Sequence, residues 1–173
     1  MKYNPDIHHR RSIRLKNYDY SSNGIYFITI CTQDRAMLFG EIVGADSISA
    51  LMVLNDAGKM IDALYQETMQ QFHGVVSAKH IVMPNHIHGI IAIDRADMES
   101  APTLSAIIQS FKRNTTIKYI NAVKEGLFPP FNKRVWQRNY FERIIRNEPE
   151  HQAKWQYIDE NPATWADDYY YTK

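Results

Sequence analysis

The sequence contains a single cysteine, Cys31, among its 173 residues. An internal disulfide is therefore impossible, and we expect the chain to work in a reducing compartment. No apolar run approaches the ~20 residues that a membrane-spanning helix needs, and the N-terminus lacks the apolar core of a signal peptide. These absences argue against a membrane protein or a secreted one, so we expect a cytoplasmic protein, nucleoid-associated if its partner is DNA.

Repeats, low-complexity segments and internal linkers are also missing from the sequence. Hydrophobic residues make up 45% of the chain and charged residues 23%, which is ordinary for a soluble globular protein and argues against long disorder. We therefore expect one domain over residues 1–173, with residues 1–20 as a basic N-terminal arm and residues 163–173 as a tail without a predicted element.

The chain also lacks a strong net charge, because its formal value is only +1. That value alone argues against a nucleic-acid-binding protein, but the basic side chains are unevenly distributed. Residues 1–20 carry five basic and two acidic side chains, and residues 111–146 carry nine basic and two acidic ones. This distribution predicts a basic surface for phosphate groups, although lysines on a solvated helix would produce the same counts.

Hydrophobic periodicity and turn residues predict an alternation of strands and helices. In chain order we expect a strand at 25–32, a small hairpin from 38–43 and 51–54, a helix at 55–72, strands at 75–83 and 86–94, a helix at 104–123, a strand at 135–145 and a helix at 148–161. This order indicates an α+β fold with a βαββαβ core, an antiparallel sheet with helices on one face, and a trailing helix.

The first candidate for chemistry is the pair His86 and His88, which opens the predicted strand 86–94. Side chains two residues apart on a strand point to the same face, so both imidazoles could hold one metal ion. We expect Gly89, which has no side chain, to leave room for a bulky ligand. The alternative is that the two histidines merely share a face and one of them is satisfied by a hydrogen bond in the core.

The trailing helix supplies the second candidate. A step of about 100° per residue places Trp155 and Ile158 on one side as core anchors, and Tyr157 and Asn161 on another. A phenol and an amide oxygen four residues apart could face the same metal ion. The alternative is a half-buried aromatic at Tyr157, and Tyr140 is the nearest rival among the tyrosines.

A third group of residues surrounds the predicted strand 135–145. Arg138, Arg143 and Arg146 could bind phosphate oxygens, since a guanidinium group pairs with phosphate through two hydrogen bonds. Trp136 and Tyr140 lie between them in the sequence and could stack on unpaired bases. Packing in the core and at its rim is the alternative for these two aromatic residues.

Three motifs occur in order and carry a family resemblance, namely Met83–Gly89 (MPNHIHG), Trp136–Glu142 (WQRNYFE) and Tyr157–Pro162 (YIDENP). Together they resemble the REP-associated tyrosine transposases, a branch of the single-tyrosine HUH transposase superfamily. The segment Arg11–Leu15 and the first predicted strand look like the same group, so the resemblance extends from residue 10 to about residue 165.

The resemblance implies a ferredoxin-like core in which His86 and His88 bind a divalent cation, Mg²⁺ or Mn²⁺. It implies that Tyr157 attacks a phosphodiester of single-stranded DNA to give a 5′-phosphotyrosine link and a free 3′-hydroxyl. Related insertion-sequence transposases carry a glutamine as third metal ligand one turn after the tyrosine, and Asn161 occupies that position here. The implied partner is single-stranded or hairpin DNA, bound by a monomer or a homodimer.

Two other functions fit the same residues. In a metal-dependent phosphodiester hydrolase, the two histidines would activate water and Tyr157 would be dispensable. In a domesticated, non-catalytic hairpin-binding protein, the basic residues would matter and the histidines would not. The DNA-binding set that we predict is Arg11, Arg14, Lys112, Arg113, Arg138, Arg143, Arg146 and Lys154.

Overall fold

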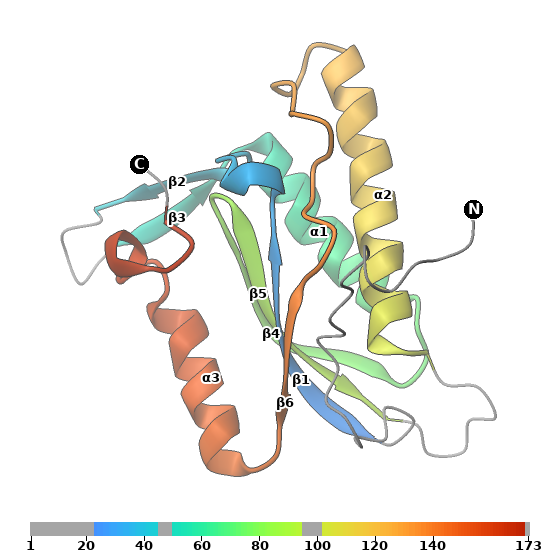
Figure 1. Cartoon of the computed structure of the whole chain (residues 1–173), viewed down its shortest axis with the longest axis vertical. Coiled ribbons are helices and arrows are strands. Elements are labelled where there is room, and N and C mark those ends of the chain that lie inside the picture. Colours follow the sequence, from blue (N-terminus) through green and yellow to red (C-terminus); the bar gives the residue numbers. More distant parts are fainter. Residues whose placement is uncertain (1–22, 45–49, 95–101, 172–173) are drawn as a thin grey trace, which may run out of the picture.

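The computed structural model describes residues 23–44, 50–94 and 102–171. Its strands and helices follow the predicted order (Figure 1). They are β1 (Gly24–Cys31), the 3₁₀ turn η1 (Gln33–Arg35), β2 (Gly40–Val43), β3 (Leu51–Leu54), α1 (Asp56–Gln70), β4 (Val75–Met83), β5 (His86–Ile93), α2 (Leu104–Lys124), β6 (Phe141–Ile145), α3 (Glu148–Glu160) and the 3₁₀ turn η2 (Trp165–Asp167). The predicted N-terminal arm, with Arg11 and Arg14, lies outside the described residues.

Four strands form one antiparallel sheet in the order β4-β5-β1-β6. The connection βαββαβ with this strand order is the ferredoxin-like arrangement, so the α+β prediction is confirmed. Strands β2 and β3 pair separately as a small antiparallel ribbon, as the sequence predicted. Helices α1 and α2 cover one face of the large sheet, and α3 lies over the other face (Figure 1).

Each long helix begins at a side chain that accepts a hydrogen bond from the first turn. Asn55 accepts from the Gly58 amide at 2.8 Å, and Asn147 accepts from the Glu150 amide at 2.9 Å. Thr103 caps α2 in the same way. A capped start is typical of Asn and Thr, so the beginnings of the helices are fixed by local sequence.

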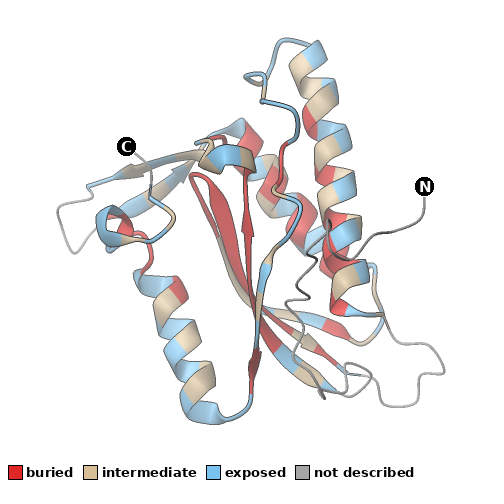
Figure 2. Ribbon diagram, viewed as in Figure 1, coloured by how far each residue is buried: buried red, intermediate tan, exposed pale blue. Residues whose placement is uncertain are grey.

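The two central strands are buried on both faces, and Figure 2 shows most of β5 and much of β1 in red. On the α1 and α2 side, alternate residues such as Tyr26, Ile28 and Ile91 form the main hydrophobic core. The other face of the same strands carries Thr29 opposite His88. The pleat therefore separates an apolar core from a polar layer beneath α3.

Gly89 does not open the histidine site, so that expectation was wrong. It alternates with His88 along β5 and therefore faces α1, where a Cβ built on it would lie 2.2 Å from the hydroxyl oxygen of Tyr65. The glycine is required by close packing of α1 on the sheet. A ligand approaching the histidines comes from the α3 side.

We expect Gly89→Ala to lower the free energy of unfolding by about 1–3 kcal/mol, because the new methyl group overlaps a buried side chain. Tyr65→Phe removes the overlapping oxygen, and the next atom, a ring carbon, is 3.1 Å from that Cβ. The double variant should therefore recover part of the loss. Urea unfolding of the two single variants and the double variant measures this coupling. Purely additive effects would contradict it.

Strand β6 is shorter than predicted, since it spans only Phe141–Ile145. The residues before it turn away from the sheet because Lys112 of α2 holds their backbone. Its ammonium group donates to the carbonyls of Gln137 at 2.9 Å and Asn139 at 3.0 Å. Lys112 is half-buried. Its hydrogen bonds to these loop carbonyls replace the strand pairing that a longer β6 would have made.

Trp136 lies in the core. It therefore serves in packing, the alternative considered from the sequence, and cannot stack on an unpaired base. It is 4% exposed, forms a single β-bridge with Thr32, and donates its indole N–H to the Thr115 hydroxyl at 2.9 Å. An indole with a buried partner for its only donor is a stable core element. Trp136 thereby ties the start of the loop before β6 to α2.

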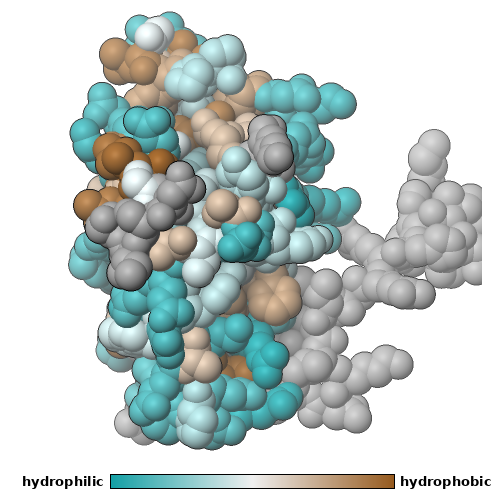
Figure 3. Space-filling view, turned by 90° about the vertical axis from the view of Figure 1, so that its left-hand side faces the viewer, coloured by the Kyte–Doolittle hydropathy of each residue, from teal (hydrophilic) through white to brown (hydrophobic). Residues whose placement is uncertain are grey.

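The surface on the α3 side is mostly hydrophilic, with smaller hydrophobic groups (Figure 3). The exposed apolar side chains of the β2–β3 ribbon are Val43, Leu51 and Val53.

Among the helices that the structure describes, none is long and apolar enough to cross a membrane.

Candidate active site

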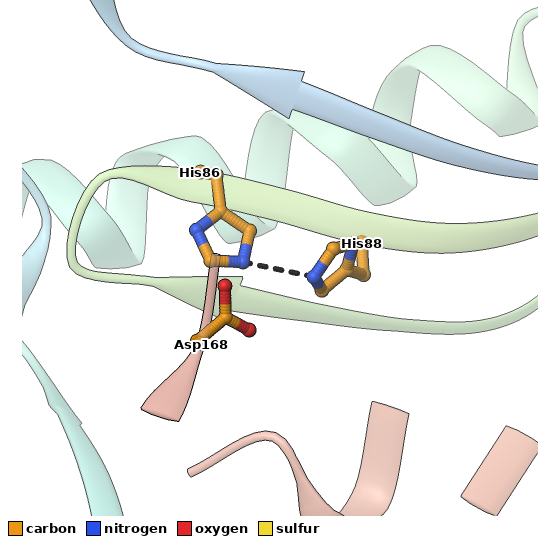
Figure 4. Close-up of side chains that lie close together, drawn as sticks. All are labelled: His86, His88 and Asp168. Carbon is orange, nitrogen blue, oxygen red and sulfur yellow. Dashed lines mark hydrogen bonds between the residues drawn. The ribbon is translucent and has the colours of Figure 1, made fainter. Parts of the chain in front are cut away.

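His86 and His88 lie side by side on β5, and both are fully buried. Their Nε2 atoms point toward each other and are 2.9 Å apart, as Figure 4 shows. The strand geometry therefore places the two imidazoles on one face, as the H-x-H spacing predicted. The centre of the site lies at these two Nε2 atoms.

The opposite nitrogen of each ring has its own partner. His86 Nδ1 lies 2.8 Å from Asn85 Oδ1, and His88 Nδ1 lies 2.8 Å from the hydroxyl oxygen of Thr29. An amide oxygen only accepts, so His86 carries its proton on Nδ1 and offers a lone pair at Nε2. Such outer partners are what fix the tautomer of metal-binding histidines.

Asp168 completes a group of three possible ligands. One ligand atom each from His86, His88 and Asp168 lies within 4.8 Å of the others, and Figure 4 shows the carboxylate directed at the histidine pair. Asp168 follows η2 in the segment where the sequence predicted no element. Sequence reasoning missed it because one aspartate in a tail without periodicity carries no signal.

Asn161 ends α3 and is completely buried. Its amide nitrogen donates to Asp168 Oδ2 at 2.8 Å, whereas its Oδ1 atom has no hydrogen-bond partner among the residues described here. A buried carbonyl oxygen without a donor is unfavourable unless something else, such as a cation, satisfies it. With two imidazole nitrogens, a carboxylate and an orphaned oxygen, the donor set fits a divalent cation, and the nitrogen share suits Mn²⁺ better than Mg²⁺.

Tyr157 projects from α3 toward this group. Its ring centroid is 5.0 Å from that of His88 and 5.8 Å from that of Phe27, and its hydroxyl donates to Asp168 Oδ2 at 3.4 Å. Burial raises the pKa of the Tyr157 phenol, and the negative charge of Asp168 raises it further. The phenol is thus kept protonated at physiological pH.

The side of α3 that faces the sheet differs from the predicted one. Ile158 is buried as expected, but Trp155 is 38% exposed and lies under the Lys79 ammonium group, 4.4 Å from its ring centroid. Lys79 also pairs with Asp159. The helical-wheel prediction was wrong for Trp155 because it assumed an apolar contact face, while α3 covers a polar layer and presents Tyr157 to it.

Lys154 lies one turn before the tyrosine on the same side of α3. Its Nζ atom is 4.7 Å from the Phe27 ring centroid and 5.3 Å from the Tyr157 ring centroid. Burial lowers the pKa of Lys154, and the neighbouring Arg143 lowers it further. A half-buried cation therefore stands beside the phenol.

The predicted basic residues divide into two groups. Arg143, Arg146 and Lys154 lie together around the end of β6 and the start of α3, where Arg143 pairs with Glu150 at 3.2 Å. Lys112 and Arg113 are on α2, which covers the opposite face of the sheet, and the Lys112 ammonium group is held by loop carbonyls. Arg138 is exposed on the loop before β6.

Burial controls the charge of the histidine pair. It lowers the pKa of His86 from 6.5 to about 4, and it lowers the pKa of His88 well below its usual value, with His86 adding to that effect. Both imidazoles are therefore neutral at physiological pH. Neutral imidazole is the form that binds a metal ion.

The metal-free protein should lose stability as the pH falls from about 7 to about 4. In that window the unfolded chain takes up protons on these histidines and the folded chain does not, so the free energy of unfolding falls with pH. Urea unfolding in EDTA at a series of pH values measures the slope. A free energy that stays constant over this range, or rises, would contradict the buried neutral pair.

Two proteins of Haemophilus influenzae are similar in sequence to this chain. No family model matches the chain. An uncharacterized protein of Haemophilus influenzae is 37% identical over 98% of this chain and 97% of its own length. A second protein of that organism, named "Putative REP-associated tyrosine transposase", is 23% identical over 86% of this chain and 77% of its own length.

Two solved structures share the fold. One is a REP-associated tyrosine transposase bound to a REP hairpin, with a TM-score of 0.59 and 18% identity over 90% of this chain and 74% of that one. In sequence and in fold, the chain is similar to REP-associated tyrosine transposases. The other structure is a transposase-like protein of Deinococcus radiodurans, with a TM-score of 0.51 and 14% identity over 87% of this chain and 98% of that one.

Proposed function

We propose that this protein cleaves and rejoins single-stranded DNA through a covalent link to Tyr157. The observation that carries the proposal is the position of the phenol, which lies against His88 and donates to Asp168 inside one buried polar layer. A surface tyrosine would have neither contact. Enzymes that split one difficult step into two use such a positioned nucleophile.

The residues that would hold a divalent cation are His86 and His88 through Nε2 and Asp168 through its carboxylate, with the free oxygen of Asn161 as a further ligand. When bound, the cation neutralises charge on the scissile phosphate and favours ionisation of the nearby phenol. Mn²⁺ is the ion that this mixed set of ligands suits best.

The chain supplies both the nucleophile of the cleavage step and the acceptor of its proton. The Tyr157 oxygen forms a bond to phosphorus while the bond from phosphorus to the 3′ oxygen breaks. The phenolic proton passes to Asp168 Oδ2, which already accepts the hydrogen bond. The 3′ oxygen leaves and takes a proton from water. The link conserves the energy of the phosphodiester, so attack by another 3′-hydroxyl reverses the step and transfers the strand.

We further propose hairpin DNA as the substrate. The REP-associated relative was solved with a REP hairpin. Here Lys154 supplies positive charge beside the Tyr157 ring, and Arg143 adds to the positive charge around Lys154. Arginine pairs with phosphate through two hydrogen bonds. Because Tyr157 contacts His88 and Asp168 of its own chain, one chain contains the groups that the step requires, which supports a monomer as the active form.

One gel assay tests the function and separates it from both alternatives. Labelled hairpin DNA is incubated with the protein, with and without Mn²⁺, and free, bound and covalently attached DNA are resolved. The proposal requires a Mn²⁺-dependent adduct that survives denaturation. A hydrolase would give cleaved DNA without an adduct, and a binding protein would give only the non-covalent complex.

A further inference from the structure

Asn85 occupies the turn between β4 and β5, directly before the first histidine of the site, and it is completely buried. A buried carboxamide must find partners for both its oxygen and its nitrogen. The two ends of the Asn85 side chain bind different partners. The oxygen contacts His86, and the nitrogen contacts the segment that carries Asp168.

The oxygen end serves His86. Asn85 Oδ1 lies 2.8 Å from His86 Nδ1 and, as an acceptor only, keeps the proton on that nitrogen. The imidazole therefore presents the lone pair of Nε2 toward His88. Without this acceptor, the buried ring is free to carry its proton on Nε2, which removes it as a ligand.

The nitrogen end holds the segment that carries Asp168. Asn85 Nδ2 donates to the Tyr170 carbonyl at 2.8 Å and to the Arg35 carbonyl at 3.3 Å. The Tyr170 amide in turn donates to Asp168 Oδ1 at 2.6 Å. The carboxylate is thus fixed through a backbone turn that is attached to the Asn85 side chain.

Arg35 provides a second attachment of the same segment. Its guanidinium group donates to the Tyr169 carbonyl at 2.7 Å and lies 4.7 Å from the Tyr169 ring centroid. Asp34 and Arg35 both have a φ of 55°, a left-handed conformation that is uncommon for residues other than glycine. Such conformations persist where surrounding contacts require them. Here the Arg35 carbonyl accepts from the Asn85 side chain, and the Arg35 guanidinium group reaches Tyr169 of the tail.

We propose that Asn85 is a positioning residue that sets two of the three metal ligands at once, the tautomer of His86 and the location of Asp168. The inference rests on the metal site of the proposed function. It adds that the tail following α3 is part of this site and that one amide couples it to the histidine pair.

Three variants separate the two ends of the side chain. Asn85→Asp keeps an acceptor for His86 but turns a carboxylate oxygen toward the carbonyls of Arg35 and Tyr170. Asn85→Ala removes both ends. Arg35→Ala removes only a tail attachment and leaves the His86 contact intact. Asn121→Ala, an exposed asparagine on α2, is the matched control.

Two measurements on the full chain report on the two ends without relying on activity. Hydrogen–deuterium exchange of the metal-free protein follows the amides of residues 165–171, and EPR titration of free Mn²⁺ gives the affinity. We expect exchange of the tail to become faster by roughly tenfold or more in Asn85→Asp, Asn85→Ala and Arg35→Ala. Mn²⁺ affinity should fall by roughly 10- to 100-fold in Asn85→Ala and by less in Arg35→Ala. The control should match the wild type.

The outcomes distinguish this inference from the proposed function. Wild-type exchange and wild-type Mn²⁺ affinity in Asn85→Asp and Arg35→Ala would overturn the role of Asn85, whatever the protein does to DNA. A wild-type protein that does not bind Mn²⁺ would contradict both the inference and the metal site. An adduct that forms without Tyr157 would contradict the proposed function alone, while faster exchange and weaker Mn²⁺ binding in the variants would still support Asn85.

Discussion

Tyr157→Phe is expected to abolish covalent attachment to hairpin DNA and to leave hairpin binding nearly unchanged. The substitution removes the oxygen that forms the bond to phosphorus but keeps the ring that packs on Phe27 and His88. Loss of a nucleophile costs factors of roughly 10³ or more in rate, so the adduct should vanish from a denaturing gel. Binding measured by a native gel should stay within about twofold of the wild type.

Tyr140→Phe is the matched control for this experiment. Tyr140 is the rival tyrosine from the sequence, and its hydroxyl is 3.2 Å from the Ser105 hydroxyl, on the α2 side of β6. The variant should form the adduct at the wild-type rate. If Tyr157→Phe still formed an adduct, the nucleophile would be a different phenol, and Tyr170, whose ring centroid is 4.8 Å from that of His86, would be the first to test.

Local sequence determines much of this site because strand geometry depends on neighbouring residues. The alternation along β5 places His86 and His88 on one face whatever the rest of the chain does. Capping residues such as Asn55 and Asn147 likewise fix where helices start. The order of strands and helices, and with it the ferredoxin-like fold, follows from patterns of this kind.

The parts that sequence reasoning missed depend on contacts between distant residues. Asp168 reaches the histidines because Arg35 and Asn85 hold the backbone of the tail. Strand β6 ends early because Lys112, on another element, satisfies the carbonyls before it. Neither Lys112 nor Asp168 belongs to a local pattern that a sequence window could detect.

The two faces of the sheet also explain how α3 differs from α1. Helix α1 packs by several apolar side chains into the main core, whereas Ile158 is the one residue of α3 that is buried. The rest of its inward surface is Tyr157, Lys154 and, at its end, Asn161. Because α3 covers a polar layer, its inward side carries polar groups in place of apolar ones. The ion pair between Lys79 and Asp159 supplies part of its attachment to the sheet.

Asp168→Asn is expected to lower Mn²⁺ affinity by roughly 100-fold, and Asn161→Ala by a smaller factor. The two histidines are neutral when they bind, so the carboxylate is the only negative ligand in the group and contributes most to holding a divalent cation. Asn161 offers one neutral oxygen, so its loss removes a weaker ligand together with the hydrogen bond that orients Asp168.

Calorimetric titration of Mn²⁺ into protein freed of metal measures both affinities. Asp167→Asn is the matched control, because Asp167 is the exposed neighbour in the same turn and loses the same charge. Equal losses in Asp167→Asn and Asp168→Asn would mean that net charge alone attracts the cation. A larger loss in Asn161→Ala than in Asp168→Asn would instead make the asparagine at the end of α3 the third ligand and leave Asp168 as the acceptor of the Tyr157 proton. The Mn²⁺ affinities of Asp168→Asn and Asn161→Ala therefore show which residue is the third ligand. Asn161 belongs to the sequence motif Tyr157–Pro162, whereas only the fold brings Asp168 to the site.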